Sequence, residues 1–314
     1  MEGRERCITA FGLAIHCAWP LPAAGSVKAS EHPGLATTVR LLPSEQFDAE
    51  QARSSERIFE QRYSDGQAYF TIDRGAADYR LWFEGHGRYL VAADGATIGC
   101  EDATVARDRR ERFLFAHPLP LAALLRGFEL MHASAVCGER GVAAFVGPSG
   151  AGKTSLAIRL VLRGAEFVTD DVLCLESAEG APRVHAGPPF MAVPPDDQAL
   201  IGMGAGRLGS AVGMSDKVHA SPPPTGHVLP LRAVFYLEPG NALELLPIAE
   251  CDAQRLLASA FAPYLMTPER LMRHLAISHL ISASVDQFRL RVPRTGQLDA
   301  VAESLHPYLE ELVM

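Results

Sequence analysis

The segment Gly147–Thr154 has the residue types and spacing of a phosphate-binding loop. Its sequence, Gly-Pro-Ser-Gly-Ala-Gly-Lys-Thr, matches the Walker A pattern G-x-x-x-x-G-K-[ST] in full. Glycines let main-chain amides surround phosphate oxygens, and the start of a helix adds partial positive charge. We therefore expect a nucleoside triphosphate here, with Lys153 reaching the β- and γ-phosphates and Thr154 ligating Mg²⁺.

The neighbouring residues supply the context that this loop requires. An apolar run at 142–146 predicts a strand before it, and 155–163 predicts a helix after it, which Gly164 would end. A Gly-rich turn without function is the alternative, and these flanking elements disfavour it. With ATP and Mg²⁺ as the expected ligands, the residues expected to contact the nucleotide are Gly147, Ser149, Gly150, Ala151, Gly152, Lys153, Thr154 and Ser155.

Two adjacent carboxylates, Asp170 and Asp171, end the next predicted strand at 165–171. The carboxyl ends of strands are where α/β sheets place their ligand contacts. One carboxylate can serve Mg²⁺, for which we name Asp171 beside Thr154, and the other is free to act as a base. The sequence does not decide which Asp has which role, and a tight turn with two solvated acids is the alternative.

Four basic residues are candidates for contacting the substrate. Lys217 and His219 lie in a stretch rich in Pro and Gly, 180–230, which we expect to be a long functional loop. Arg289 and Arg291 alternate on one face of a predicted strand at 288–293. An exposed charged loop is an equally good interpretation of the first pair.

Composition limits the classes of protein to consider. The chain has 314 residues, of which 48% are hydrophobic, and a net charge of −8. This length suggests two domains, and the acidic balance argues against a nucleic-acid partner. The six cysteines form no C-x-x-C pair, which fits a reducing cytosol better than a zinc site or a disulfide framework. Because no apolar run is long enough to span a membrane, we expect a cytoplasmic protein without membrane contact.

Hydrophobic patterning predicts a β-rich region at 1–125 followed by a mixed region at 126–314. In the first region a strand or strand pair is expected at 8–19, and a helical turn at 55–62. The remaining predicted strands are 36–42, 69–72, 79–83, 88–91, 130–136, 172–176, 228–237 and 242–246. The remaining predicted helices are 109–128, broken near Pro118 and Pro120, and 251–262, 268–283 and 298–313. His274 and His279 are expected to be ordinary helix residues.

The chain resembles the HPr kinase/phosphorylase-like group of P-loop kinases, which is related in fold to phosphoenolpyruvate carboxykinases. The resemblance depends on His132 in the strand before the loop, on the loop itself, and on Thr169-Asp170-Asp171, with Asp170 seventeen positions after Lys153. It implies an α/β fold, with a P-loop kinase core at 126–314 preceded by a smaller β-rich domain at 1–125. It also implies that an Asp is the base and that His132 neighbours the phosphoryl site.

The resemblance implies an ATP- and Mg²⁺-dependent kinase that phosphorylates a serine hydroxyl. The chain lacks the paired glutamates that follow the Asp pair in the bifunctional enzymes; Asp196-Asp197 is the only acidic pair at 185–215. The expected acceptor is therefore a peptide or small protein other than HPr, such as a lasso-type precursor peptide. A small-molecule kinase acting on free serine or a sugar, and a slow nucleotide-dependent switch, are the alternatives. Related kinases often oligomerise, so a homo-oligomer is possible.

Overall fold

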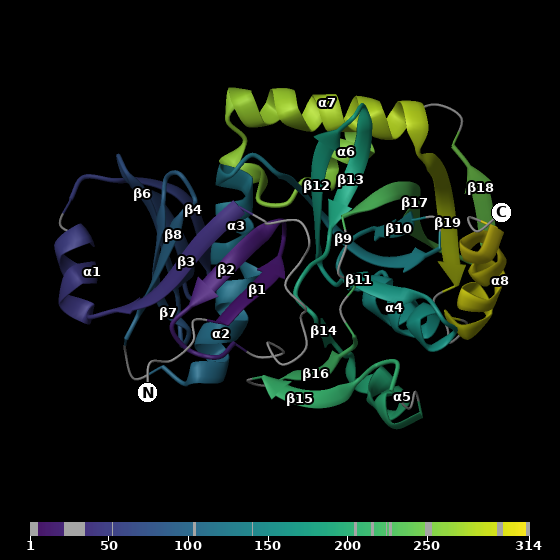
Figure 1. Cartoon of the computed structure of the whole chain (residues 1–314), viewed down its shortest axis with the longest axis horizontal. Helices are drawn as coiled ribbons and strands as arrows, with labels where there is room; N and C mark the ends of the chain where they lie inside the picture. Colours follow the sequence, from purple (N-terminus) through teal and green to yellow (C-terminus); the bar gives the residue numbers. More distant parts are fainter. Residues whose placement is uncertain are drawn as a thin grey trace. The chain divides into compact units, whose positions relative to one another are not determined.

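The protein has a mixed α/β structure that divides into two compact units (Figure 1). The computed structural model describes residues 6–21, 35–51, 53–102, 105–139, 141–203, 206–214, 217–223, 225, 228–248, 253–293 and 298–311. Unit 1 comprises Met1–Phe128 and Ala262–Met266, and unit 2 comprises Glu129–Phe261 and Thr267–Met314. The α/β class expected from the sequence is confirmed.

Unit 1 is built on one eight-stranded sheet. Phe113 and His117, from α2 and the turn after it, pack their rings on Phe70 of this sheet, and burial lowers the pKa of His117 to about 4. The strands, in spatial order, are β1 (Arg6–Ala10), β2 (Leu13–Cys17), β3 (Leu35–Leu42), β8 (Thr97–Glu101), β7 (Gly87–Ala92), β6 (Asp78–Phe83), β5 (Ala68–Arg74) and β4 (Glu56–Arg62). The helices are α1 (Ser44–Gln51), α2 (Arg107–Ala116) and α3 (Pro118–Leu125).

Residues 55–62 form the edge strand β4 rather than the helical turn predicted for them. Phe59 of β4 packs edge-on to Phe70 at 5.2 Å between ring centroids and stacks on Tyr264 at 4.1 Å. Pairing with β5 and the contacts with Phe70 and Tyr264 come from outside the segment 55–62, so they outweigh its local helical preference. Helix α1 and strand β8 were not predicted.

Unit 2 contains a second eight-stranded sheet with parallel strands at its centre. Strands β10, β17 and β19 are parallel, and β10 also pairs with β9, antiparallel. The strands, in spatial order, are β10 (Gly141–Val146), β9 (Glu129–Gly138), β12 (Val172–Ala178), β13 (Ala181–His185), β17 (Leu229–Gly240), β19 (Asp286–Pro293) and β18 (Glu244–Pro247), with β11 (Glu166–Thr169) beside β9. Strand β10, which leads into the Gly147–Thr154 segment, therefore has β9 on one side and β17 on the other.

Helices cover both faces of this sheet (Figure 1). On one face, α4 (Lys153–Leu162) and α8 (Leu298–Glu311) bury a core that includes Leu156 and Leu305. On the other, α6 (Ala253–Ala258) and α7 (Pro268–Ser284) bury Leu256 and Ile277. The helix predicted at 251–262 is shorter because Ser259 and Phe261 exchange main-chain hydrogen bonds with β9 instead.

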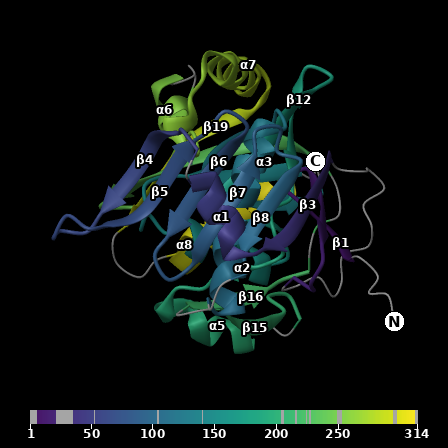
Figure 2. The ribbon, with the colours of Figure 1, turned by 90° about the vertical axis from the view of Figure 1, so that its left-hand side faces the viewer.

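The prediction of a long loop at 180–230 is wrong, because much of this stretch forms strands and helices. Besides β13 it forms β14 (Met191–Ala192), the 3₁₀ turn η1 (Pro195–Asp197), α5 (Gln198–Met203), β15 (Ser210–Met214) and β16 (Lys217–Ser221). We call the described residues between 191 and 221 the arm. Its strands form a separate sheet in the order β14-β16-β15, and β15, β16 and α5 lie together in both views (Figure 2). Met191, Val193 and Ala220 are buried in the core around α4, which explains why the arm is ordered.

Helix α7 attaches to β9 through a buried ionic cluster. Glu129 is fully buried, and Arg270 Nη2 donates to its Oε1 at 2.9 Å. His274, predicted to be an ordinary helix residue, places Nδ1 at 3.2 Å from the same oxygen. Hydrogen bonds from His274 and Arg270 outweigh desolvation and hold the pKa of Glu129 below its ordinary value.

No helix in the described residues is long and apolar enough to cross a membrane. The described cysteines are free thiols, and all except Cys7 are buried.

Candidate nucleotide and phosphoryl-transfer site

The predicted phosphate loop connects β10 to α4, as the sequence pattern requires. Gly150 and Gly152 adopt φ values of +79° and +88°, which strain any residue with a Cβ. A Cβ on Gly147 would come within 3.0 Å of the Leu237 carbonyl oxygen, so the first glycine permits close packing on β17. Gly150 and Gly152 are therefore required by backbone conformation, and Gly147 by close packing.

The loop leaves hydrogen-bond donors available for an anion. No side chain caps the N-terminus of α4, and the amides of Ser149, Gly150 and Gly152 donate to no acceptor among the described residues. Lys153 is 7% exposed and its Nζ donates to the carbonyl oxygens of Gly147, at 2.8 Å, and of Pro148, at 3.1 Å. Burial lowers the pKa of Lys153, opposed by the charges of the nearby acidic pair. Amides and an ammonium together suit a polyphosphate.

Asp170 accepts three hydrogen bonds at the end of β11. Its Oδ1 accepts from Thr154 Oγ1 at 2.7 Å and from Ser134 Oγ at 3.1 Å, and its Oδ2 accepts from the Ala192 amide at 3.0 Å. Burial raises the pKa of Asp170; the Thr154 hydrogen bond lowers it and the neighbouring Asp171 charge raises it. The carboxylate therefore links the loop helix, β9 and the arm.

Asp171 has a different environment from its neighbour. Its side chain is 64% exposed, and its Oδ1 lies 3.2 Å from Nδ1 of His132, whose side chain is 37% exposed. The backbone of Asp171 has φ +83°, a left-handed conformation that is uncommon for a residue other than glycine. Such local strain concentrates at functional sites. The turn presents this carboxylate outward, next to an imidazole.

The oxygen atoms of Thr154 and Asp170 suit Mg²⁺ bound together with a nucleotide. One hydroxyl, on Thr154, and the carboxylate of Asp170 are hard oxygen ligands, and Mg²⁺ is commonly held by one or two protein oxygens plus phosphates and water. Among the described residues, no group of three or more His, Cys, Asp or Glu side chains forms a metal cluster. The residues present therefore fit a nucleotide-bound Mg²⁺.

Three of the four predicted substrate residues have described side chains. In the arm, His219 is the register partner of Ala192, whose amide donates to Asp170. His219 is 3% exposed in β16 and meets the Phe190 ring edge-on at 5.8 Å. Arg289 lies 3.6 Å from a Glu238 oxygen, and Arg291 pairs with Glu244 at 2.7 Å. The backbone of Lys217 belongs to β16, and its side chain lies outside the described part. Of the loop residues, Ala151 packs against the core around α4 and Ser155 lies in the first turn of that helix.

Two groups at the site were missed by the sequence analysis. Ser134 lies two positions after His132 on β9, and because strand side chains alternate, the pair shares one face. That spacing was a usable signal. No sequence pattern indicated the Ala192 amide, because every residue except proline has a main-chain N–H donor.

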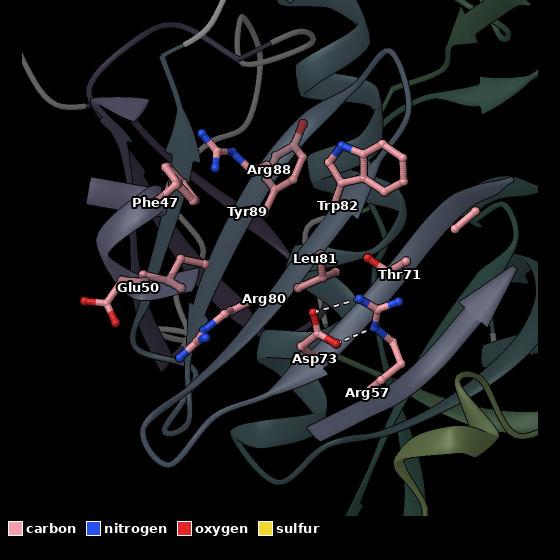
Figure 3. Close-up of a pocket in the computed structure, with 12 residues that line it drawn as sticks. Phe47, Glu50, Arg57, Thr71, Asp73, Arg80, Leu81, Trp82, Arg88 and Tyr89 are labelled. Atoms are coloured by element: carbon pink, nitrogen blue, oxygen red, sulfur yellow. Dashed lines mark hydrogen bonds and ion pairs between the residues drawn. The ribbon is translucent and has the colours of Figure 1, made fainter. Parts of the chain in front are cut away.

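A second region rich in charges lies in unit 1. A cavity of about 500 Å³ opens on the face of its sheet, lined among others by Arg57, Arg80 and Arg88 (Figure 3). Arg57 pairs with Asp73, Arg80 pairs with Asp78 at 2.9 Å, and Arg88 pairs with Asp48 and Glu101 at 2.6 and 2.5 Å.

No family model and no curated protein sequence matches the chain. Among solved structures, the chain is similar to the HPr(Ser) kinase/phosphatase from Coxiella burnetii, with a TM-score of 0.35 and 13% sequence identity. The alignment covers 59% of this chain and 92% of that chain.

Proposed function

We propose that this protein is a kinase that transfers the γ-phosphoryl group of ATP to a serine hydroxyl of a peptide or small protein. One observation carries the proposal. A phosphate loop with open amides, the Thr154–Asp170 hydrogen bond and the His132–Asp171 pair converge where the carboxyl ends of β10 and β11 meet the middle of β9. Phosphoryl transfer needs these parts: an anion cradle, a metal site and a residue that orients the nucleophile.

Thr154 and Asp170 are the residues that would hold Mg²⁺, which when bound neutralises charge on the phosphates. This assignment replaces Asp171, the ligand expected from the sequence, because Asp170 and not Asp171 lies within hydrogen-bond distance of Thr154. Ser134 and the Ala192 amide fix the orientation of the Asp170 carboxylate.

Asp171 is the residue that we assign to the acceptor hydroxyl. Its carboxylate is exposed, and His132 holds one of its oxygens, so the other is free to accept the serine proton. In the reaction the bond between the γ-phosphorus and the β,γ-bridging oxygen breaks, a bond from that phosphorus to the serine oxygen forms, and the serine proton passes to Asp171. Positioning is the main contribution, because an ordinary carboxylate is a weak base.

The exposure of Asp171 favours a large acceptor over a small one. A small-molecule kinase is expected to enclose its acceptor in a pocket with converging polar groups. Here the side chain of the assigned base is 64% exposed, and the amide of Ala192 in the arm donates a hydrogen bond to Asp170. A peptide such as a lasso-type precursor could lie along such a surface.

The test is transfer from γ-labelled ATP to an oriented library of serine-containing peptides, to free serine and to common sugars. We expect label on peptide serines, lost in Asp171→Asn protein that still binds nucleotide. Label on serine or a sugar alone would replace the acceptor class. Nucleotide binding with no acceptor labelled would contradict the kinase assignment and favour the nucleotide-dependent switch.

A further inference from the structure

The small sheet of the arm has one edge at the candidate site and one edge away from it. Its strand order is β14-β16-β15. At the first edge, the Ala192 amide of β14 donates to Asp170. At the second, the outer side of β15 pairs with no strand among the described residues. The sheet therefore extends from the Asp170 carboxylate to an open edge.

The hydrogen-bond pattern shows which amides of β15 point outward. The Val193 amide donates to the Val218 carbonyl oxygen, so the main-chain polar groups of Val218 point toward β14. Because these groups alternate along an antiparallel strand, His219 points toward β15, where its partner is Val212. It follows that the amides and carbonyls of Ala211 and Gly213 face away from β16.

The open edge lacks the features that normally prevent strand addition. Natural edge strands are protected by charged residues, prolines, bulges or very short length. The edge strand β4 carries Glu56, Arg57, Glu60 and Arg62 among its seven residues, and β18 is four residues long and ends at Pro247. Strand β15 reads Ser-Ala-Val-Gly-Met, with neither charge nor proline, and Ser210 and Ala211 are exposed.

We propose that the outer edge of β15 binds an extended, weakly charged segment of the acceptor peptide by adding it as a fourth strand. This inference rests on the proposed kinase function and names how the acceptor is recognised. Main-chain hydrogen bonds to Ala211 and Gly213 supply the affinity, as in other cases of strand addition. The peptide is the occupant we choose because the same sheet contacts the site through β14.

The geometry sets where the phosphorylated serine lies in the peptide. A strand added to β15 is three strand spacings from β14, or about 14 Å at ~4.8 Å per spacing. The sheet extends from β14 on the side opposite Asp170, since the Ala192 amide points away from β16. An extended chain advances ~3.3 Å per residue, so the serine is at least about four residues outside the docked segment.

The experiment compares Ala211→Pro with Ala211→Val. Proline removes the outward amide, which donates to no acceptor in the described part of the chain, and proline is tolerated on edge strands. Valine adds a side chain of similar size and keeps the amide. The probes are peptides with five alternating valine and glutamine residues, joined to a single serine by glycine-asparagine spacers of about two to about eight residues.

We expect the peptides to slow hydrogen exchange at residues 210–214 of the wild-type and Ala211→Val proteins but not of Ala211→Pro, in the presence of a non-hydrolysable ATP analogue. The KM for the peptides is expected to rise about tenfold or more in Ala211→Pro, with ATP binding unchanged, and transfer should require the longer spacers. Equal KM values for the two variants, exchange unaffected by every peptide, or transfer that ignores spacer length would overturn the inference.

Two outcomes distinguish failure of the docking inference from failure of the proposed kinase function. If wild-type protein transfers phosphate to none of the library peptides, the proposed function itself fails. The second outcome is that the wild-type protein sediments as a dimer, Ala211→Pro sediments as a monomer, and the variant keeps the wild-type KM for the peptides. In that case the edge of β15 pairs with a second copy of the chain, and only the docking inference is wrong.

Discussion

The cavity of unit 1 and the phosphate-loop site of unit 2 both contain several charged groups, but they use them differently. In the cavity, Arg57, Arg80 and Arg88 each pair with a carboxylate of the same unit, and Figure 3 shows the pair of Arg57 with Asp73. At the loop, main-chain amides lack acceptors among the described residues, and Lys153 is held only by carbonyl groups of its own loop. The number of charged side chains therefore does not distinguish the two regions. They differ in how many hydrogen-bond donors still lack an acceptor in the folded chain.

The largest effect is expected from Lys153→Ala. Removing the ammonium takes away charge stabilisation of the transferred group, so we expect phosphoryl transfer to fall by at least about 10³-fold. Label transfer from ATP measures it. Arg57→Ala in the cavity is the matched control and should change transfer less than about twofold, since that side chain pairs with Asp73 and Glu60 of the same sheet. Comparable losses in both proteins would break the distinction between the two regions.

The second prediction distinguishes the roles of Asp170 and Asp171. Asp171→Asn is expected to lower kcat about 10²-fold while Mn²⁺ still binds with nucleotide, because we propose that Asp171 acts on the acceptor hydroxyl and not on the metal. Asp170→Asn should weaken Mn²⁺ binding itself, which electron paramagnetic resonance measures directly. Loss of metal in the Asp171 variant and its retention in the Asp170 variant would exchange the two roles.

A smaller effect is expected from Ser134→Ala, as a shift in pH dependence. Burial raises the pKa of Asp170, and the Ser134 hydroxyl opposes this by donating to the charged form. Without the hydroxyl the pKa of Asp170 rises further, so the acidic limb of kcat/KM should move to higher pH while the plateau is retained. An unchanged acidic limb would show that Ser134 does not support the carboxylate.

The raised pKa of Asp170 also fixes the sign of its effect on stability. Folded protein keeps this proton at pH values where the unfolded chain has lost it. The contribution of Asp170 to the free energy of unfolding therefore decreases as pH rises from the ordinary aspartate range through the raised pKa. Asp170→Asn should remove this pH dependence in denaturant titrations, as expected for a residue kept for function.

The smallest effect on transfer is expected in the cavity, where Arg88→Ala should leave kcat/KM unchanged. It should cost about 1–3 kcal/mol in the free energy of unfolding, because Arg88 holds Asp48 of α1 and Glu101 of β8. Arg88 holds the pKa of Glu101 below its ordinary value, so the stability from this pair is lost as pH falls through that lowered pKa. A large loss of transfer would instead indicate a functional cavity.

Local patterns predicted the parts of the site that are local in the structure. The loop, the strand before it and the helix after it follow one another in sequence, so spacing was enough to place Gly147 to Gly152 between β10 and α4, and Lys153 and Thr154 in the first turn of α4. His132 and Asp171 were both named, although their contact depends on pairing between β9 and β12.

What the sequence did not predict depends on distant contacts. The arm is ordered because Met191 and Ala220 are buried near α4, while its Pro and Gly content indicated a loop. Strand β4 depends on β5 and Tyr264, so its own residues suggested a helical turn. The roles that we propose for Asp170 and Asp171 could not be assigned from the sequence, because they rest on hydrogen bonds that Asp170 accepts from Thr154, Ser134 and the Ala192 amide in the folded chain.

The return of residues 262–266 to unit 1 has a consequence for synthesis on the ribosome. Phe59 of β4 stacks on Tyr264, which is 205 positions later in the chain. At ~5–20 residues per second, the ribosome needs on the order of 10 s to pass from Phe128 to Tyr264. During that interval Phe59 of the nascent first unit lacks the ring of Tyr264 on which it stacks, so the first part of the protein to emerge is among the last to be completed.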